Sequence, residues 1–302
     1  MAHFLKNIVT FGAFLIMIIF CVFSLNGQDL NSNLPKNTRI YKDLSYSEAD
    51  DKELLLDLYI PANCDGCPLV VWVHGGAWRA GNKENPEHAL TLLQQNFALA
   101  SINYRLSQEA TFPAQIIDCK AAIRWLRAHA SDYGYDPGKI GVFGSSAGGH
   151  LVALLGTSAG QDEWEKGDHL DHLSQVQAVC DWYGPTDFLR MDDQTGGMIH
   201  LSADSPESQL IGGDIRNYPD KVRLANPITY ISGQTPPFLI IHGKSDRTVI
   251  DQQSVLLHEA LKQKGLESKL ILLEGAGHGG GPIWQQQMKP VADFFTKYLK
   301  GR

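Results

Sequence analysis

The sequence predicts an α/β fold in which a mostly parallel β-sheet is wrapped by helices. Short runs that are apolar at nearly every position, as strands buried on both faces are, recur along the chain. Longer segments with helical periodicity separate them, which favours parallel strands joined by crossover helices. With 43% hydrophobic and 20% charged residues, the chain also has enough apolar material for such a core.

The expected sheet begins with a hairpin and continues with six further strands. Arg39–Tyr46 and Glu53–Ile60 alternate in polarity around Asp50 and Asp51, as two antiparallel strands do. The further apolar runs are Leu69–His74, Ala98–Tyr104, Ile140–Gly144, Val176–Trp182, Phe238–Gly243 and Lys269–Glu274. Helical periodicity marks Pro113–His129, Gln252–Lys264 and Ile283–Leu299. The expected sheet therefore has eight strands.

The N-terminal residues are expected to lie outside the fold. Lys6 precedes an apolar run from Ile8 to Leu25, and small or polar residues follow it, so we predict a signal peptide at residues 1–27. The run also approaches the length of a membrane span, which leaves an uncleaved N-terminal anchor as the alternative. Either way the rest of the chain is expected to be exported to the periplasm or the extracellular space. After cleavage of the signal we expect no stable membrane association.

Residues 28–302 are expected to form a single domain. The stretch 185–237 interrupts the strand–helix rhythm, since it is polar and rich in glycine, proline and aspartate. It is interpreted as a lid-like insertion between the sixth and seventh strands, over the carboxyl edge of the sheet. The net charge of −7 and the lack of a Lys/Arg cluster argue against a nucleic-acid partner. No oligomeric state is predicted.

The four cysteines beyond the signal fall into two kinds. Cys64 and Cys67 form a C-x-x-C in a turn-rich stretch, and in an oxidising compartment a local disulfide is the favoured interpretation. A zinc site needs more ligands than this pair offers, and a redox-active pair stays an alternative although no helix start follows it. Cys119 and Cys180 are expected to be small buried apolar residues.

The strongest chemical signal is the G-x-S-x-G sequence at Gly144–Gly148. It follows an expected strand and opens an expected helix, so the chain must turn sharply at Ser146. Such a turn lifts the Ser146 hydroxyl above the sheet edge as a candidate nucleophile. It also places the Ala147 amide at a helix N-terminus, where unsatisfied N–H groups favour a negative oxygen.

A serine hydroxyl needs a base, and the base needs an orienting carboxylate. His278 lies on a glycine-rich loop after the last expected strand, from which it can lean over the sheet edge. Asp246 follows the preceding strand, and the order Ser146, Asp246, His278 is one of the known triad orders. Asp251, which precedes a helix and suits an N-cap, and Glu274 are the rival carboxylates.

The loop His74–Trp78 (H-G-G-A-W) supplies the fourth element. Its glycines let backbone amides approach a reacting oxygen closely, so the amides of Gly76 and Ala77, with that of Ala147, are the candidate oxyanion hole. A tight turn between strand and helix is compatible with this role. His74 is expected to belong to the scaffold of the loop and not to act as a base.

These motifs resemble those of α/β-hydrolases of the esterase and lipase group, over roughly Leu54 to Leu299. Within that group, His74–Trp78, Phe143–Leu151, Asp181–Asp187 and Gly275–Gly280 resemble the bifunctional feruloyl and acetyl xylan esterase family. The resemblance implies an α/β-hydrolase catalytic domain. Ala77 replaces the third glycine of the lipase-type H-G-G-G loop, a variant that kynurenine formamidases also carry.

The remaining candidate residues concern the substrate and metals. The aromatic rings of Trp78, Trp182 and Tyr183 are candidates to stack on a sugar or a feruloyl ring, with packing under the insertion as the alternative. The acidic and histidine-rich stretch Asp162–His172 is expected to be a solvated loop, although a metal site is conceivable there. The predicted chemistry requires neither a metal ion nor an organic cofactor.

The sequence thus predicts a secreted serine carboxylic ester hydrolase. Resemblance and export together suggest that it removes acetyl or feruloyl groups from plant polysaccharide such as xylan. A general carboxylesterase acting on small esters, an aryl formamidase and a peptidase are the catalytic alternatives. The alternative from another class is a non-catalytic binding protein with this fold, but such proteins typically lose the serine or the histidine.

Overall fold

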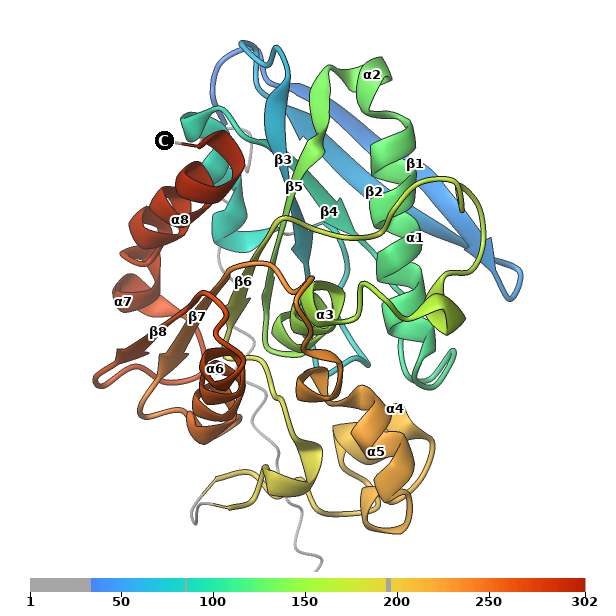
Figure 1. Cartoon of the computed structure of the whole chain (residues 1–302), viewed down its shortest axis with the longest axis vertical. Coiled ribbons are helices and arrows are strands. Elements are labelled where there is room, and N and C mark those ends of the chain that lie inside the picture. The colour runs from blue at the N-terminus through green and yellow to red at the C-terminus, as the bar shows by residue number, and fades with distance from the viewer. Residues whose placement is uncertain (1–33, 85, 194–196, 302) are drawn as a thin grey trace, which may run out of the picture. The chain divides into compact units, whose positions relative to one another are not determined.

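The computed structural model describes residues 34–301 apart from 85 and 194–196, so the predicted signal peptide lies outside the described residues. Eight strands form one sheet in the order β1-β2-β4-β3-β5-β6-β7-β8 (Figure 1). Their bounds are β1 Arg39–Ala49, β2 Lys52–Ile60, β3 Cys67–Val73, β4 Ala98–Ile102, β5 Tyr135–Ser145, β6 Ala178–Trp182, β7 Phe238–Gly243 and β8 Ser268–Leu273. The predicted fold class is confirmed.

The sheet is antiparallel at one end and parallel in the rest. β1 and β2 form the expected hairpin, closing with Ala49 opposite Lys52, and β2 pairs with β4 in antiparallel fashion. All later pairings, from β4–β3 to β7–β8, are parallel. Every residue of β3, β4, β6 and β7 is buried, which is why these strands read as continuous apolar runs.

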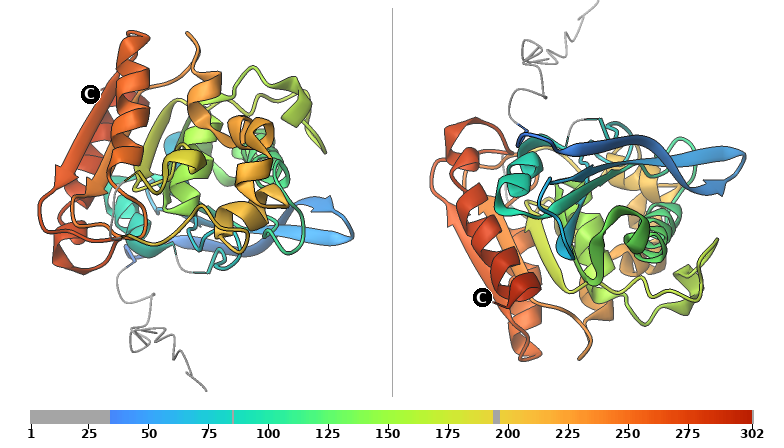
Figure 2. Two further views of the ribbon diagram at one scale, coloured as in Figure 1. Left: turned by 90° about the horizontal axis from the view of Figure 1, so that it is seen from below. Right: turned by 90° about the horizontal axis from the view of Figure 1, so that it is seen from above.

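Helices cover both faces of the sheet (Figure 2). The α-helices are α1 Ala114–Ala128, α2 Ala130–Tyr133, α3 Ala147–Thr157, α4 Pro206–Ile211, α5 Pro219–Ala225, α6 Gln252–Gln263, α7 Gly281–Gln285 and α8 Met288–Lys300. Alternate β3 residues point to opposite faces: Val71 joins a core with α1, α3 and α6, whereas Val70 joins one with α8 and the 3₁₀-helix η2 (Glu87–Gln95).

The last helical segment differs from the prediction. In place of one helix over Ile283–Leu299, the chain forms α7 and α8 with a break between them. Pro290 has no backbone N–H to bond the carbonyl four residues earlier, and its ring would clash with that carbonyl in a continuous helix. It is tolerated in the first turn of α8, so a new helix starts at Met288.

In its described residues, the segment between β6 and β7 contains only short helices. Besides α4 and α5 these are the 3₁₀-helices η4 Phe188–Arg190, η5 Ile215–Asn217 and η6 Pro227–Tyr230. Figure 1 shows α4 and α5 beyond the end of the sheet where the parallel strands finish. This is the place that the sequence predicts for the insertion, and its role as a lid stays a prediction.

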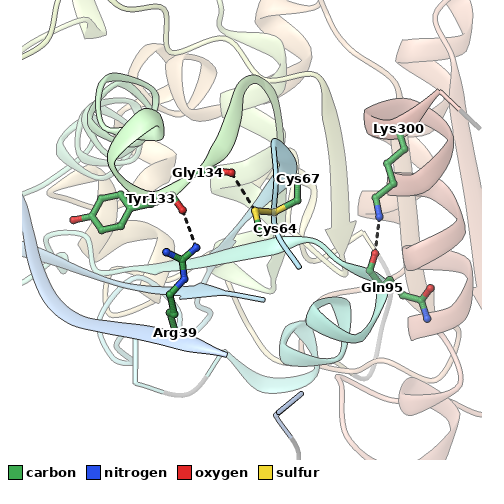
Figure 3. The surroundings of a disulfide bond; sticks show 7 residues. All are labelled: Arg39, Cys64, Cys67, Gln95, Tyr133, Gly134 and Lys300. Carbon is green, nitrogen blue, oxygen red and sulfur yellow. Dashed lines mark hydrogen bonds between the residues drawn. A yellow bond between two sulfur atoms is a disulfide. The ribbon is translucent and has the colours of Figure 1, made fainter. Parts of the chain in front are cut away.

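The cysteines are arranged as the favoured interpretation expects. Cys64 and Cys67 form a disulfide at the start of β3, the amino end of the sheet (Figure 3). The Gly66 amide between them donates to the Gly134 carbonyl at 3.0 Å, which ties this turn to the residue that joins α2 to β5. Cys119 and Cys180 are buried thiols. Among the described residues, no helix combines the length and apolar character needed to cross a bilayer.

Candidate active site

Ser146 occupies a strained turn between β5 and α3. Its φ of 55° lies in the left-handed region, and its amide donates to the Trp182 carbonyl at 2.9 Å. Both flanking glycines are needed because a Cβ on Gly144 would lie 2.4 Å from the Gly148 carbonyl oxygen, and one on Gly148 only 2.0 Å from the Val73 carbonyl oxygen. The strand, the turn and the helix therefore pack too closely for any side chain at these two positions.

Three side chains from distant parts of the chain meet at this turn. His278 Nε2 lies 2.9 Å from Ser146 Oγ, and His278 Nδ1 lies 2.7 Å from Asp246 Oδ2. An ionised carboxylate only accepts hydrogen bonds, so Nδ1 donates to Asp246. In the neutral ring Nε2 then carries a lone pair, which accepts the Ser146 hydroxyl proton. This is the arrangement that activates a serine nucleophile.

Asp246 is buried and held from several sides. The amides of Thr248 and Val249 donate to Oδ1 at 2.8 and 3.0 Å. Burial alone would raise the pKa of the Asp246 carboxyl, but its contacts with the imidazoles of His242 and His278 hold that pKa well below its ordinary value. Asp246 therefore stays ionised at neutral pH, as an orienting carboxylate must.

The rival carboxylates lie elsewhere. Glu274 pairs with Lys244 at 2.6 Å, and its side chain is exposed. Asp251 sits directly before α6, the helix start that the sequence indicates for it. Of the three candidates, Asp246 is the carboxylate that the structure brings to His278.

The loop after β3 runs beside the nucleophile. A Cβ on Gly75 would lie 2.9 Å from the Ser145 carbonyl oxygen and 3.3 Å from Ser146 Cβ, so a side chain there would force the backbone to shift. Gly76, Ala77 and Trp78 all have positive φ values, of 108°, 54° and 57°. Within the described parts of the chain, the amides of Gly76 and Ala77 donate to no protein acceptor. These amides, with that of Ala147 at the first position of α3, remain our proposed oxyanion hole.

His74 is part of the scaffold of this loop. Its ring stacks on Tyr104 with ring centroids 4.3 Å apart, and its Nδ1 donates to the Gly75 carbonyl at 2.7 Å. Burial lowers the pKa of His74 to about 4, although the hydrogen bond to Gly75 opposes this. A neutral ring locked in this way shapes the loop and is poorly placed to exchange protons.

The three aromatic candidates for substrate contact differ in position. Trp78 and Trp182 are each only 1% exposed, and their rings pack against neighbouring aromatic rings, so the packing role left open by the sequence fits them. Tyr183 lies against the site, with its ring centroid 4.6 Å from that of His278 and 4.6 Å from that of Trp284. Tyr183 is therefore the one of the three that shapes the surroundings of the candidate base.

One neighbour of the site carries no motif signal. His242, in β7, is fully buried with its Nε2 3.3 Å from Asp246 Oδ2. The pattern that marks it is a histidine near the end of an otherwise apolar strand, four residues before the candidate carboxylate.

The acidic stretch Asp162–His172 is bound to helix α1 through Glu165. Glu165 accepts hydrogen bonds from the buried Lys120, at 2.8 Å, and from the buried Arg124. Among the residues that the structure describes, no three histidine, cysteine or acidic side chains gather as a metal site would require.

Comparison with known proteins places the chain in a family. The sequence family described as BD-FAE matches residues 56–261. The chain belongs to the BD-FAE family. This is the bifunctional feruloyl and acetyl xylan esterase family that the motifs resemble, so the resemblance is confirmed.

Individual relatives of this BD-FAE chain are named as esterases. The probable carboxylic ester hydrolase LipM of Mycobacterium tuberculosis is 34% identical over 238 residues, 74% of this chain and 54% of LipM. A solved structure described as a truncated form of a carbohydrate esterase from gut microbiota is 35% identical, with a TM-score of 0.81, over 88% of this chain and 99% of that one. The chain spans about half the length of most of the curated relatives that it matches.

A second solved structure, described as a bifunctional GH43-CE of Bacteroides eggerthii, is 38% identical with a TM-score of 0.77. It matches 86% of this chain but only 38% of its own length. The similarity therefore covers nearly the whole fold described above and one part of the larger enzyme.

Proposed function

We propose that this protein hydrolyses carboxylic esters through an acyl-enzyme on Ser146. The observation that carries the proposal is the continuous hydrogen-bond chain from Ser146 through His278 to Asp246. The names of the matched relatives support the same reaction class.

The geometry suggests the following steps. Ser146 Oγ attacks the ester carbonyl carbon while His278 Nε2 takes the hydroxyl proton, and Asp246 stabilises the resulting imidazolium. The carbonyl oxygen becomes an alkoxide that the amides of Gly76, Ala77 and Ala147 stabilise. When the tetrahedral intermediate collapses, the bond to the alcohol breaks and His278 gives that alcohol its proton. A water activated by His278 then hydrolyses the acyl-enzyme and restores the free serine.

For the substrate we propose short acyl esters, acetyl or feruloyl, on plant polysaccharide such as xylan. Membership of the BD-FAE family and the likeness to two carbohydrate-esterase structures support this class. The predicted export signal suits a polymeric substrate outside the cell. A general carboxylesterase for small esters is the second candidate, because curated relatives such as LipM carry that kind of name.

The test combines one variant with a substrate panel. Ser146→Ala should lower kcat about 10⁶-fold on every hydrolysed ester, by analogy with triad deletions in serine hydrolases. The matched control is Ser158→Ala, at the other end of α3, which should keep wild-type activity. Retention of more than a tenth of the esterase rate by Ser146→Ala would refute the mechanism.

The panel separates the substrate candidates. It contains acetylated and feruloylated xylan oligomers, p-nitrophenyl acetate, methyl ferulate and N-formylkynurenine. Faster turnover of the xylan oligomers than of the small esters supports the polysaccharide assignment. Turnover of p-nitrophenyl acetate alone favours the general carboxylesterase, and turnover of N-formylkynurenine alone favours the formamidase.

A further inference from the structure

A second histidine, His242, lies behind the candidate triad. Its ring is fully buried near the carboxyl end of β7. Its Nε2 lies 2.8 Å from the Val249 carbonyl oxygen and 3.3 Å from Asp246 Oδ2, and its Nδ1 lies 2.7 Å from Ser254 Oγ. Each ring nitrogen therefore faces a polar partner that the fold fixes in place.

The partners determine where the proton of His242 resides. A carbonyl oxygen and an ionised carboxylate oxygen only accept hydrogen bonds, so Nε2 must carry the hydrogen. Nδ1 of the neutral ring is then a lone pair that accepts the Ser254 hydroxyl hydrogen. The acceptors at Nε2 thus fix the tautomer, the hydrogen bond with Ser254 holds the plane of the ring, and the Nε2–H lies between Val249 and Asp246.

This arrangement ties the strand to the turn that carries Asp246. The backbone of Val249 is bound on both sides, because its amide donates to Asp246 Oδ1 at 3.0 Å and its carbonyl accepts from His242 at 2.8 Å. Asp246 Oδ2 lies between two imidazoles, 2.7 Å from His278 Nδ1 and 3.3 Å from His242 Nε2. The carboxylate can rotate only if these contacts break together.

We infer that His242, whose ring Ser254 holds in place, is a positioning residue that keeps Asp246 in the plane from which it orients His278. The inference rests on the proposed function, because the role of Asp246 belongs to that mechanism. A histidine that merely fills the core would affect stability, whereas a positioning histidine affects the chemical step in protein that remains folded.

The experiment compares three variants at two positions with a matched control. His242→Leu removes both hydrogen-bonding atoms, His242→Gln keeps an N–H near the place of Nε2, and Ser254→Ala leaves the ring without its donor. The control is His258→Leu, because His258 makes the same kind of contact, Nδ1 to Ser268 Oγ at 2.8 Å, on α6. Melting curves establish which variants are folded at the assay temperature.

We expect a specific kinetic signature with p-nitrophenyl acetate. His242→Leu should lower kcat about 10- to 100-fold, since small misplacements of catalytic groups cost that much, with KM changed less than about twofold. The acid limb of its pH–rate profile should move to higher pH, because an Asp246 carboxylate that has lost a contact attracts the imidazolium more strongly. His242→Gln should recover most of kcat, Ser254→Ala should fall between, and His258→Leu should match wild type.

Two results would overturn the inference. One is a folded His242→Leu protein with wild-type kcat and an unmoved acid limb. The other is a folded His242→Gln protein that loses as much kcat as the leucine variant. If the leucine variant does not fold, wild-type kinetics in a folded Ser254→Ala protein would also overturn it. Failure of the proposed function looks different, because wild-type protein itself would then hydrolyse no ester.

Discussion

Replacement of Gly148 by alanine tests whether activity depends on the close packing of β3 against the turn that carries Ser146. The new Cβ would lie 2.0 Å from the Val73 carbonyl oxygen and 2.7 Å from that of His74, whereas ordinary contact begins at 3.4 Å. Backbone cannot rotate away as a side chain can, so the first turn of α3 must move from β3 by about 1.4 Å. That movement separates Ser146 from the loop that carries the proposed oxyanion amides.

A displacement of this size should lower kcat about 100-fold, because positioning errors near 1 Å have that effect. Overpacking should also cost about 1–3 kcal/mol of stability, which leaves the protein folded at 25 °C. The assay is p-nitrophenyl acetate hydrolysis with a melting curve for each protein. Gly160→Ala is the matched control, because a Cβ there meets nothing within 4 Å. A Gly148→Ala protein with activity within twofold of wild type would refute the reasoning.

Three further outcomes are expected. Burial raises the pKa of Asp181 to about 6, so the contribution of this carboxyl to stability should fall by up to about 3 kcal/mol as the pH rises from 4 to 7. Urea titrations should therefore show Asp181→Asn gaining stability relative to wild type over this range. Replacing Cys64 and Cys67 by serine should lower the free energy of unfolding by at most about 2 kcal/mol in thermal melts, because the loop that the disulfide closes is short. It should leave kcat unchanged, because the candidate active site lies at the opposite end of the sheet. Burial lowers the pKa of His200, but the contact with Glu207 outweighs burial and leaves that pKa raised. The pair therefore stabilises the fold fully below about pH 6.5 and less as the pH rises through the folded-state pKa. Glu207→Gln should destabilise the protein more at pH 6 than at pH 9 in urea titrations, and equal effects at the two pH values would contradict this.

The sequence predicts the strands well where burial makes them uniformly apolar. Phe238–Gly243 is found with the predicted bounds, because all six residues lie in the core. β5 begins earlier than its apolar run, at Tyr135, because this residue pairs with Cys67 although the partly or fully exposed residues 136–139 separate it from the apolar run. A hydrophobic pattern cannot predict such a start, because the register of β5 against β3 shifts between Tyr135 and Ile140.

The candidate triad is predictable for a topological reason. Ser146, Asp246 and His278 each follow a parallel strand, and the carboxyl ends of parallel strands meet at one edge of the sheet. The burial of Trp78 was not predictable in the same way. The chain at Ala77 and Trp78 adopts positive φ values, and this local backbone conformation turns the indole into the core.

The most direct test of the account is to map where a fluorophosphonate reacts. Treated protein is digested and the modified peptide is identified by mass spectrometry. The account predicts one adduct per chain, on Ser146, that is lost in Ser146→Ala and forms far more slowly in His278→Ala. An unlabelled Ser146 in protein that still hydrolyses esters, or an adduct on another residue that survives in Ser146→Ala, would contradict it.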